Sequence, residues 1–306
     1  MTPNRPLVMT AADWLMLGAL SVLWGGSFLS YRVLASEQLP PVVTVAARML
    51  LGSAFVIALF RAQGLDLRIA RRYWPRLLVF ALLNNVVPYI LFAWSEQRIG
   101  GGTAAILNAM TPVFTLLVTG LVLRTEPITA NRALGIGCGF VGVAILVGPE
   151  ALRGQDVWGQ LACLLAAFIY GFAIPFGRTL GHLGAQRLCV GQQVAASVIA
   201  APLALLFHPA AALAALDGQG WLALLSLGVL STGLAFVLFF RLLLRAGATN
   251  LSLVTLLVPV SALLFGALLL AEPLSLRALA GMAVIGAGLA CIDGRLLRRR
   301  RSVEAA

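Results

Sequence analysis

The stretch WGGSFLSYRVL at residues 24–34 returns as YGFAIPFGRTL at residues 170–180, with one glycine, one arginine and one leucine of each copy in register. The correspondence continues along both halves, in pairs such as Trp74 and Trp221, Pro112 and Pro259, and Glu126 and Glu272. The separation of about 146 residues is far longer than a solenoid repeat, and each copy holds five apolar stretches. The pattern therefore predicts a duplicated transporter.

The composition places the chain in the membrane class, since 60% of its residues are hydrophobic, 11% are charged and the mean hydropathy is +0.97. A helix of roughly 20 apolar residues crosses the hydrocarbon core of a bilayer. Ten such stretches are present, at 13–32, 42–60, 75–95, 102–123, 132–148, 157–177, 187–206, 219–240, 249–270 and 275–292. We therefore expect an all-α integral membrane protein with ten transmembrane helices and no soluble domain.

The number of spans in each half determines how the halves are oriented. Five is an odd number, so the second half must enter the membrane from the opposite face. The expected organisation is two inverted five-helix repeats, at 1–148 and 149–306, around a central cavity. The second repeat ends in a short basic tail.

The net charge of +11 comes entirely from arginine, because all 22 basic residues are of that type. With a cytoplasmic N-terminus, 17 arginines fall on the inner side and four on the outer side, while Arg48 lies within the second span. This asymmetry predicts that both termini are cytoplasmic. The expected location is the cell (inner) membrane. The run Arg298 to Arg301 is interpreted as a signal facing anionic lipid rather than a nucleic-acid site.

Several motifs resemble a known family: the Trp24-Gly25 pair, Pro112, the two Glu-Pro turns at 126–127 and 272–273, and the glycine-rich fifth and tenth spans. The chain is similar over its whole length to EamA-type carriers of the drug/metabolite transporter superfamily, and within them it looks most like the YddG-type amino-acid exporters. The resemblance implies alternating access without ATP and the export of a small organic metabolite. The first expectation is an amino acid, including aromatic ones; the alternative is another metabolite or drug class.

Pro112 and Pro259 fall inside the fourth and ninth spans. Each proline removes one N–H and displaces the carbonyl four residues earlier, here that of Asn108 or Thr255. We interpret the two prolines as hinges that line the cavity. The alternative is that Asn108 and Thr255 only join neighbouring helices by hydrogen bonds.

Polar and aromatic side chains in otherwise apolar spans predict the walls of the cavity. Uncharged polar groups in hydrocarbon point into the bundle or a wet cavity, although packing between helices is the alternative for each one alone. The candidate substrate-binding residues are Trp24, Ser27, Tyr31, Arg48, Asn84, Asn85, Tyr89, Trp94, Asn108, Tyr170, Gln192 and Gln193.

Arg48 is the one charge well inside a span. It lies about six residues past the predicted outer boundary, which is about 9 Å deep at ~1.5 Å per residue. A guanidinium at that depth should meet water, a partner or a substrate anion. A structural pair, or a side chain that snorkels to the interface, are the alternatives.

Catalytic and metal-binding patterns are absent from the sequence. The two histidines, His182 and His208, lie in loops on opposite sides, and the four cysteines form no CxxC pair. The GxGxxG at 137–142 lies inside an apolar helix, so it predicts close packing of the fifth and tenth helices rather than a dinucleotide site. We expect no catalytic residues, metal or cofactor, and a monomer or homodimer in membrane lipid. An integral membrane enzyme and a channel are the rival classes.

Overall fold

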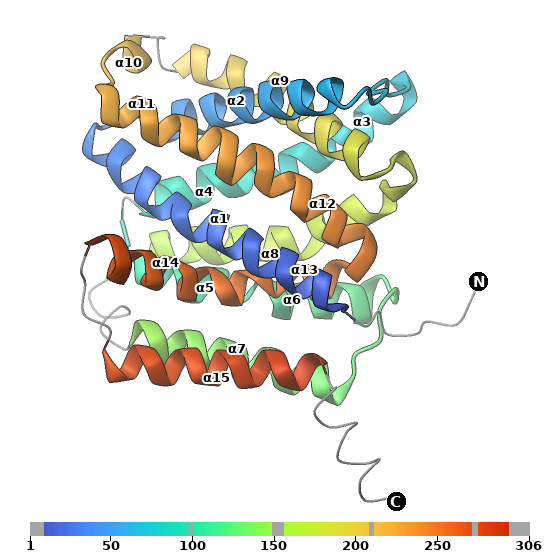
Figure 1. The fold of residues 1–306 in the computed structure, drawn as a ribbon, viewed down its shortest axis with the longest axis vertical. Helices are drawn as coiled ribbons and strands as arrows, with labels where there is room; N and C mark the ends of the chain where they lie inside the picture. The colour runs from blue at the N-terminus through green and yellow to red at the C-terminus, as the bar shows by residue number, and fades with distance from the viewer. Residues whose placement is uncertain are drawn as a thin grey trace, which may run out of the picture.

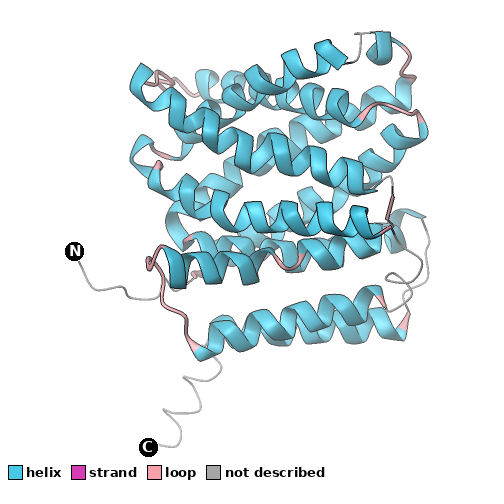
Figure 2. Cartoon of the chain, turned by 180° about the vertical axis from the view of Figure 1, so that it is seen from behind, coloured by secondary structure: helices cyan, strands magenta, loops and turns pink. Residues whose placement is uncertain are grey.

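The computed structural model describes residues 9–96, 98–99, 101–148, 156–207, 211–270 and 275–293. Within these ranges every regular element is helical, as Figure 2 shows. The fold-class prediction of an all-α chain is confirmed for this part of the protein. His208, the Glu272-Pro273 turn and the arginine run 298–301 lie outside the described residues.

The first half contains α1 (Ala11–Ser36), α2 (Pro41–Ala62), η1 (Arg71–Tyr73), α3 (Trp74–Ala81), η2 (Leu82–Val86), α4 (Val87–Glu96), α5 (Gly101–Asn108), α6 (Thr111–Leu117), η3 (Val118–Val122) and α7 (Ala130–Val147). The second half contains α8 (Val157–Thr179), η5 (Gly181–Leu183), α9 (Ala185–Phe207), α10 (Ala211–Ala214), α11 (Gly218–Leu225), η6 (Ser226–Leu234), α12 (Ala235–Ala246), α13 (Ala248–Ser252), α14 (Val254–Leu270) and α15 (Leu276–Asp293). The helices run side by side across one bundle (Figure 1).

Seven helical segments in the described residues are long and apolar enough to cross a membrane, and three shorter apolar segments accompany them, at Ile106–Val122, Ala130–Leu146 and Leu276–Ile292. Each of the ten predicted spans overlaps one of these segments. A multi-pass membrane protein is therefore the architecture, while the number of crossings stays a prediction.

Polar side chains fix where several helices begin. Thr10 and Asp13 form a capping box at α1, in which Asp13 N donates to Thr10 Oγ1 at 3.2 Å and Thr10 N donates to Asp13 Oδ2 at 2.9 Å. The carboxylates of Asp156 and Asp217 cap α8 and α11, each by accepting from two backbone N–H groups in the first turn of its helix. These caps satisfy the free N–H groups at the helix starts, where the chain enters its apolar stretches.

Ion pairs and hydrogen bonds show which loops share an end of the bundle. At one end Asp13 pairs with Arg245 at 3.0 Å, and Asp66 pairs with Arg187 at 3.3 Å. At the other end the carboxylate of Glu37 accepts from the N–H of Asp217 at 3.2 Å. Asp13 lies in the first turn of α1, and Glu37 directly follows its last residue. Since α2 then returns along the bundle to the loop that holds Asp66, these two groups of contacts lie at opposite ends of the bundle.

Helices α7 and α15 lie together at the edge of the bundle, the lowest pair in Figure 1. A Cβ on Gly288 would lie 2.6 Å from the carbonyl oxygen of Gly135, and a Cβ on Gly142 would lie 2.7 Å from the backbone nitrogen of Ile285. Only glycine allows backbones to approach this closely. The predicted tight contact of the fifth and tenth helices is confirmed.

The third and eighth predicted spans carry π-helical segments at matching places in the repeat. Asn84 and Asn85 lie in η2, and their equivalents 147 residues later, Ser231 and Thr232, lie in η6. A π segment turns side chains away from the regular helical register and recurs at functional sites. Both copies place two polar residues there.

The fourth and ninth predicted spans are interrupted. Between α5 and α6 the break follows Asn108, four residues before Pro112. In the ninth span the break lies at Leu253, and α14 then continues through Pro259. The Thr255 hydroxyl donates to the carbonyl of Ser252 at 2.9 Å, next to this earlier break.

Candidate functional site

A cavity of about 120 Å³ lies within the bundle, between helices of both halves. That space is large enough for several water molecules. Its walls come from α1, α2, η2, α4, α5 and α6 of the first half, and from α8, α12, α13 and α14 of the second. The lining residues are Trp24, Ser27, Tyr31, Arg48, Asn84, Tyr89, Phe92, Ala104, Asn108, Thr111, Tyr170, Ile174, Phe236, Phe239, Leu251, Ser252, Val254, Thr255 and Val258.

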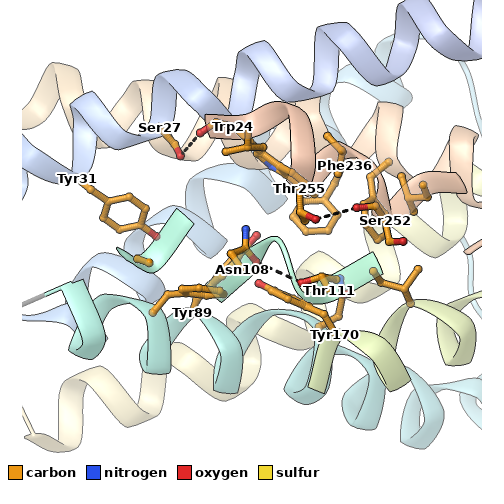
Figure 3. A pocket seen from close by; sticks show the side chains of 18 of the residues that line it. Trp24, Ser27, Tyr31, Tyr89, Asn108, Thr111, Tyr170, Phe236, Ser252 and Thr255 are labelled. Carbon is orange, nitrogen blue, oxygen red and sulfur yellow. Dashed lines mark hydrogen bonds between the residues drawn. The ribbon is translucent and has the colours of Figure 1, made fainter. Parts of the chain in front are cut away.

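Aromatic rings form much of the wall. Trp24 and Tyr31 extend from α1 toward Tyr89 and Tyr170 on the opposite side (Figure 3). The ring of Trp24 lies 6.2 Å from that of Phe236, while Phe92 stacks on Tyr170 at 6.0 Å. Such offset and edge contacts are the geometries that aromatic pairs prefer, so the rings hold one another in place.

Trp24 and Tyr170 occupy equivalent positions of the two repeats, 146 residues apart, and both line the cavity. The Trp24 indole N–H donates to the carbonyl of Ser231 at 3.1 Å, which fixes its ring against η6. The duplication therefore places one aromatic residue from each half in the same cavity.

Arg48 brings the positive charge to this cavity. Its side chain comes from α2 and is only 3% exposed. Nε donates to the hydroxyl of Thr232 at 2.9 Å, and Nη1 donates to the hydroxyl of Tyr31. The guanidinium carbon lies 4.0 Å from the ring centroid of Tyr89, a cation–π contact.

Amide side chains supply the other polar groups. Asn84 Nδ2 donates to Asn85 Oδ1 at 3.3 Å, but the Asn84 Oδ1 atom is buried and has no hydrogen-bond partner among the described residues. Asn108 Oδ1 accepts from the Thr111 hydroxyl at 3.4 Å, across the break between α5 and α6. Both amides line the cavity, so they present hydrogen-bonding groups to whatever enters it.

Eight of the twelve residues named from the sequence as substrate-binding candidates line this cavity, and four do not. Asn85 donates to the sulfur of Met49 at 3.6 Å, and Trp94 lies under Arg98, whose guanidinium carbon is 3.9 Å from the indole centroid. Gln192 and Gln193 are completely buried on α9.

Gln193 is nevertheless linked to the lining residue Arg48, because both side chains form hydrogen bonds with Thr232. Its Nε2 donates to the carbonyl of Thr232 at 3.3 Å, and Thr232 accepts from Arg48 through its hydroxyl. The Gln192 amide has no hydrogen-bond partner among the described residues. Burying an amide without hydrogen-bond partners is costly. Gln192 and Gln193 therefore form a costly pair of buried amides on α9, behind the cavity wall.

Some lining residues carry no signal in the sequence. Phe236 and Phe239 belong to the apolar stretch AFVLFF at 235–240, where nothing marks two phenylalanines as cavity residues. Thr111 and Ser252 flank the breaks of the fourth and ninth spans. For these two residues the sequence does offer a signal, because each lies in a span that contains a proline, Pro112 or Pro259.

A family model described as the EamA-like transporter family matches residues 11–148 and 157–292. The transporter YoaV of Bacillus subtilis is 26% identical over 284 residues, covering 90% of this chain and 94% of YoaV. The aromatic amino acid exporter YddG of Ancylobacter novellus is 24% identical over 233 residues, 74% of this chain and 78% of that protein. A crystal structure with 21% sequence identity matches at a TM-score of 0.76, covering 95% of this chain and 99% of that one, and shows the fold.

Proposed function

The chain belongs to the EamA-like transporter family, and from that premise we propose that it exports amino acids, aromatic ones included, by alternating access without ATP. The family makes it a multi-pass membrane transporter with a small-molecule substrate. The observation that carries the finer proposal is the aromatic cavity that helices of both halves enclose. A relative named as an aromatic amino acid exporter supports this choice of substrate.

The proposal includes an architecture. The two halves, 1–148 and 149–306, are proposed as inverted five-helix repeats of ten spans in the cell inner membrane, with both termini cytoplasmic. Two states that expose the cavity to opposite sides would then arise by exchanging the conformations of the two repeats. Pro112 and Pro259, inside the interrupted fourth and ninth spans, are proposed as the hinges, although neither is among the described residues that line the cavity.

Counterflow in proteoliposomes tests the substrate. Vesicles containing the purified protein are loaded with an unlabelled candidate, and the entry of the labelled compound from outside is followed. A panel of labelled amino acids, nucleosides and cationic drugs separates the proposed class from other metabolites or drugs. Counterflow of aromatic and large aliphatic amino acids is the expected result, with protein-free vesicles as the control. Counterflow confined to nucleosides or cationic drugs would refute the amino-acid proposal.

A further inference from the structure

The cavity contains a positive charge that no carboxylate balances among the described residues. Its described lining includes Arg48 and no aspartate or glutamate. In the described part of the chain, the hydrogen-bond and cation–π partners of Arg48 are all neutral: the Tyr31 and Thr232 hydroxyls and the Tyr31 and Tyr89 rings. Two of the five N–H donors of a guanidinium are thus occupied.

Another buried arginine, Arg132, has a carboxylate partner within the chain. Arg132 is 5% exposed, close to the 3% of Arg48, and its Nη1 lies 3.3 Å from Oε2 of Glu126. Desolvating a charge is costly unless an opposite charge or a wet cavity compensates. Arg132 has its carboxylate within the chain, whereas Arg48 faces a cavity that a ligand can enter.

A free carboxylate on the ligand would supply what Arg48 lacks. The guanidinium fork donates two parallel hydrogen bonds to a carboxylate, and such charge-assisted bonds are about twice as strong as neutral ones. An ammonium on the same ligand meets no carboxylate among the described lining residues. It would meet aromatic faces and amide oxygens, and it would share the cavity with a charge of its own sign.

Building on the proposed function, we propose that Arg48 selects substrates by their carboxylate and that an α-ammonium is not required. The substrate class is then aromatic and other apolar monocarboxylates with a small polar α-substituent, and amino acids are one member of it. The aromatic walls accept the apolar side chain, and the amide of Asn108, which lines the same cavity, forms a hydrogen bond with an α-hydroxyl or α-ammonium.

Three probes of nearly equal size test this class: phenylalanine, its 2-hydroxy acid analogue phenyllactate, and phenylalaninamide, which keeps the amine and lacks the carboxylate. Binding is measured as protection of the detergent-solubilised protein against thermal unfolding, and transport as competition in counterflow. Phenyllactate should act at concentrations within about tenfold of phenylalanine, while the amide should require at least about ten times more.

Arg48→Gln should abolish the preference for the two carboxylates over the amide. The matched control is Arg98→Gln, because Arg98 also lies against an aromatic ring, that of Trp94, but does not line the cavity. Arg48→Lys, which keeps the charge and loses the fork, should retain part of the preference and covers the case in which the glutamine variant does not fold.

The two proposals fail in different ways. Wild-type protein that acts on phenylalanine but not on phenyllactate overturns the carboxylate inference and leaves the amino-acid proposal standing. Protection by both carboxylates without any counterflow supports the inference and refutes amino-acid export. Equal action of the amide and the carboxylates, or no action of any of the three, overturns the inference.

Discussion

Glu126 joins three segments at the end of the bundle that also holds Asp13 and Arg245. Its carboxylate lies 3.3 Å from Arg132 and 3.1 Å from Arg178, and it accepts from the backbone N–H of Ala248 at 3.0 Å. The side chain is 5% exposed, so these contacts are sheltered from water. Arg178 and Ala248 belong to the second half of the chain, which makes this residue a link between the halves.

Glu126→Gln keeps the shape of this side chain and removes its charge, which leaves Arg132 buried without a counter-charge. We expect the variant to lose about 3 kcal/mol of stability, the lower end for breaking a buried pair, since Arg178 is a third exposed. Thermal unfolding in detergent measures the loss. The control is Asp66→Asn, whose pair with Arg187 is exposed and should contribute less than about 1 kcal/mol. Equal melting temperatures for both variants would refute the argument.

Residue identity alone predicted part of the cavity. A polar or charged side chain in an apolar span has few low-energy positions, so Arg48, Asn84 and Asn108 were accessible to sequence reasoning. Phe236 and Phe239 were not, because a phenylalanine in an apolar span does not indicate whether its ring faces lipid or a cavity. Gln193 was named as a substrate-binding candidate, but it does not line the cavity and instead donates from α9 to the carbonyl of Thr232, a position that its residue type alone does not reveal.

At the scale of elements, the contact between α7 and α15 depends on glycine. Gly142→Ala would put a Cβ 2.7 Å from the backbone nitrogen of Ile285 and 2.9 Å from the carbonyl oxygen of Gly281. Backbone atoms cannot rotate away, so the helices must separate, at a cost of about 1–3 kcal/mol. Gly137→Ala on the same helix is the control, since a Cβ there meets nothing within 4 Å. It should melt at or above the wild-type temperature, because alanine favours helix by up to about 1 kcal/mol. Similar destabilisation by both variants would contradict this account.

The interrupted helices make a second prediction at this scale. If Pro112 and Pro259 are hinges, Pro112→Ala and Pro259→Ala should each slow counterflow severalfold, because alanine restores a backbone donor and straightens the helix. The amount of protein inserted in the membrane should not change. Pro202 lies inside α9, which the structure shows as one uninterrupted helix, and it provides a control substitution. Normal flux in both variants would make these prolines packing residues.

Helix positions were predictable from apolar length, whereas helix irregularities were not. Each of the π segments η2 and η6 holds a pair of polar residues, but such a pair also occurs in regular helix and does not by itself predict a π turn. The break at Leu253 lies six residues before Pro259, although proline displaces the carbonyl only four residues earlier. At this break the Ser252 hydroxyl donates to the carbonyl of Thr249, and the Thr255 hydroxyl donates to the carbonyl of Ser252. The spacing of residues in the sequence does not reveal these hydrogen bonds.

At the scale of the whole molecule, the two ends of the bundle differ in charge. The end marked by Asp13 and Arg245 also holds the loop after α2, with Arg61, Arg68, Arg71 and Arg72, and the Arg178 and Arg187 region. The opposite end holds Glu37, Asp217 and the pair of Arg98 with Asp156. Contacts between distant loops thus reproduce the grouping of arginines inferred from the spans. Arginine-rich loops stay on the cytoplasmic side in most membrane proteins, so this end should face the cytoplasm.

Single cysteines, introduced after the four native ones are replaced, can test that orientation in whole cells. Arg71→Cys places a thiol in the exposed turn before α3, and Gly218→Cys places one at the start of α11, where a Cβ meets nothing within 4 Å. Gly218 is preferable to Asp217, whose carboxylate caps α11 by accepting from Gln219 at 2.7 Å. A membrane-impermeant thiol reagent added outside should label position 218 and leave position 71 unmodified until the cells are permeabilised. External labelling at position 71 with protection at 218 would reverse the topology and place the arginine-rich end outside. The same reversal would turn the end of the bundle assigned to the cytoplasm outward. The sides on which the cavity loads and releases substrate would then be exchanged.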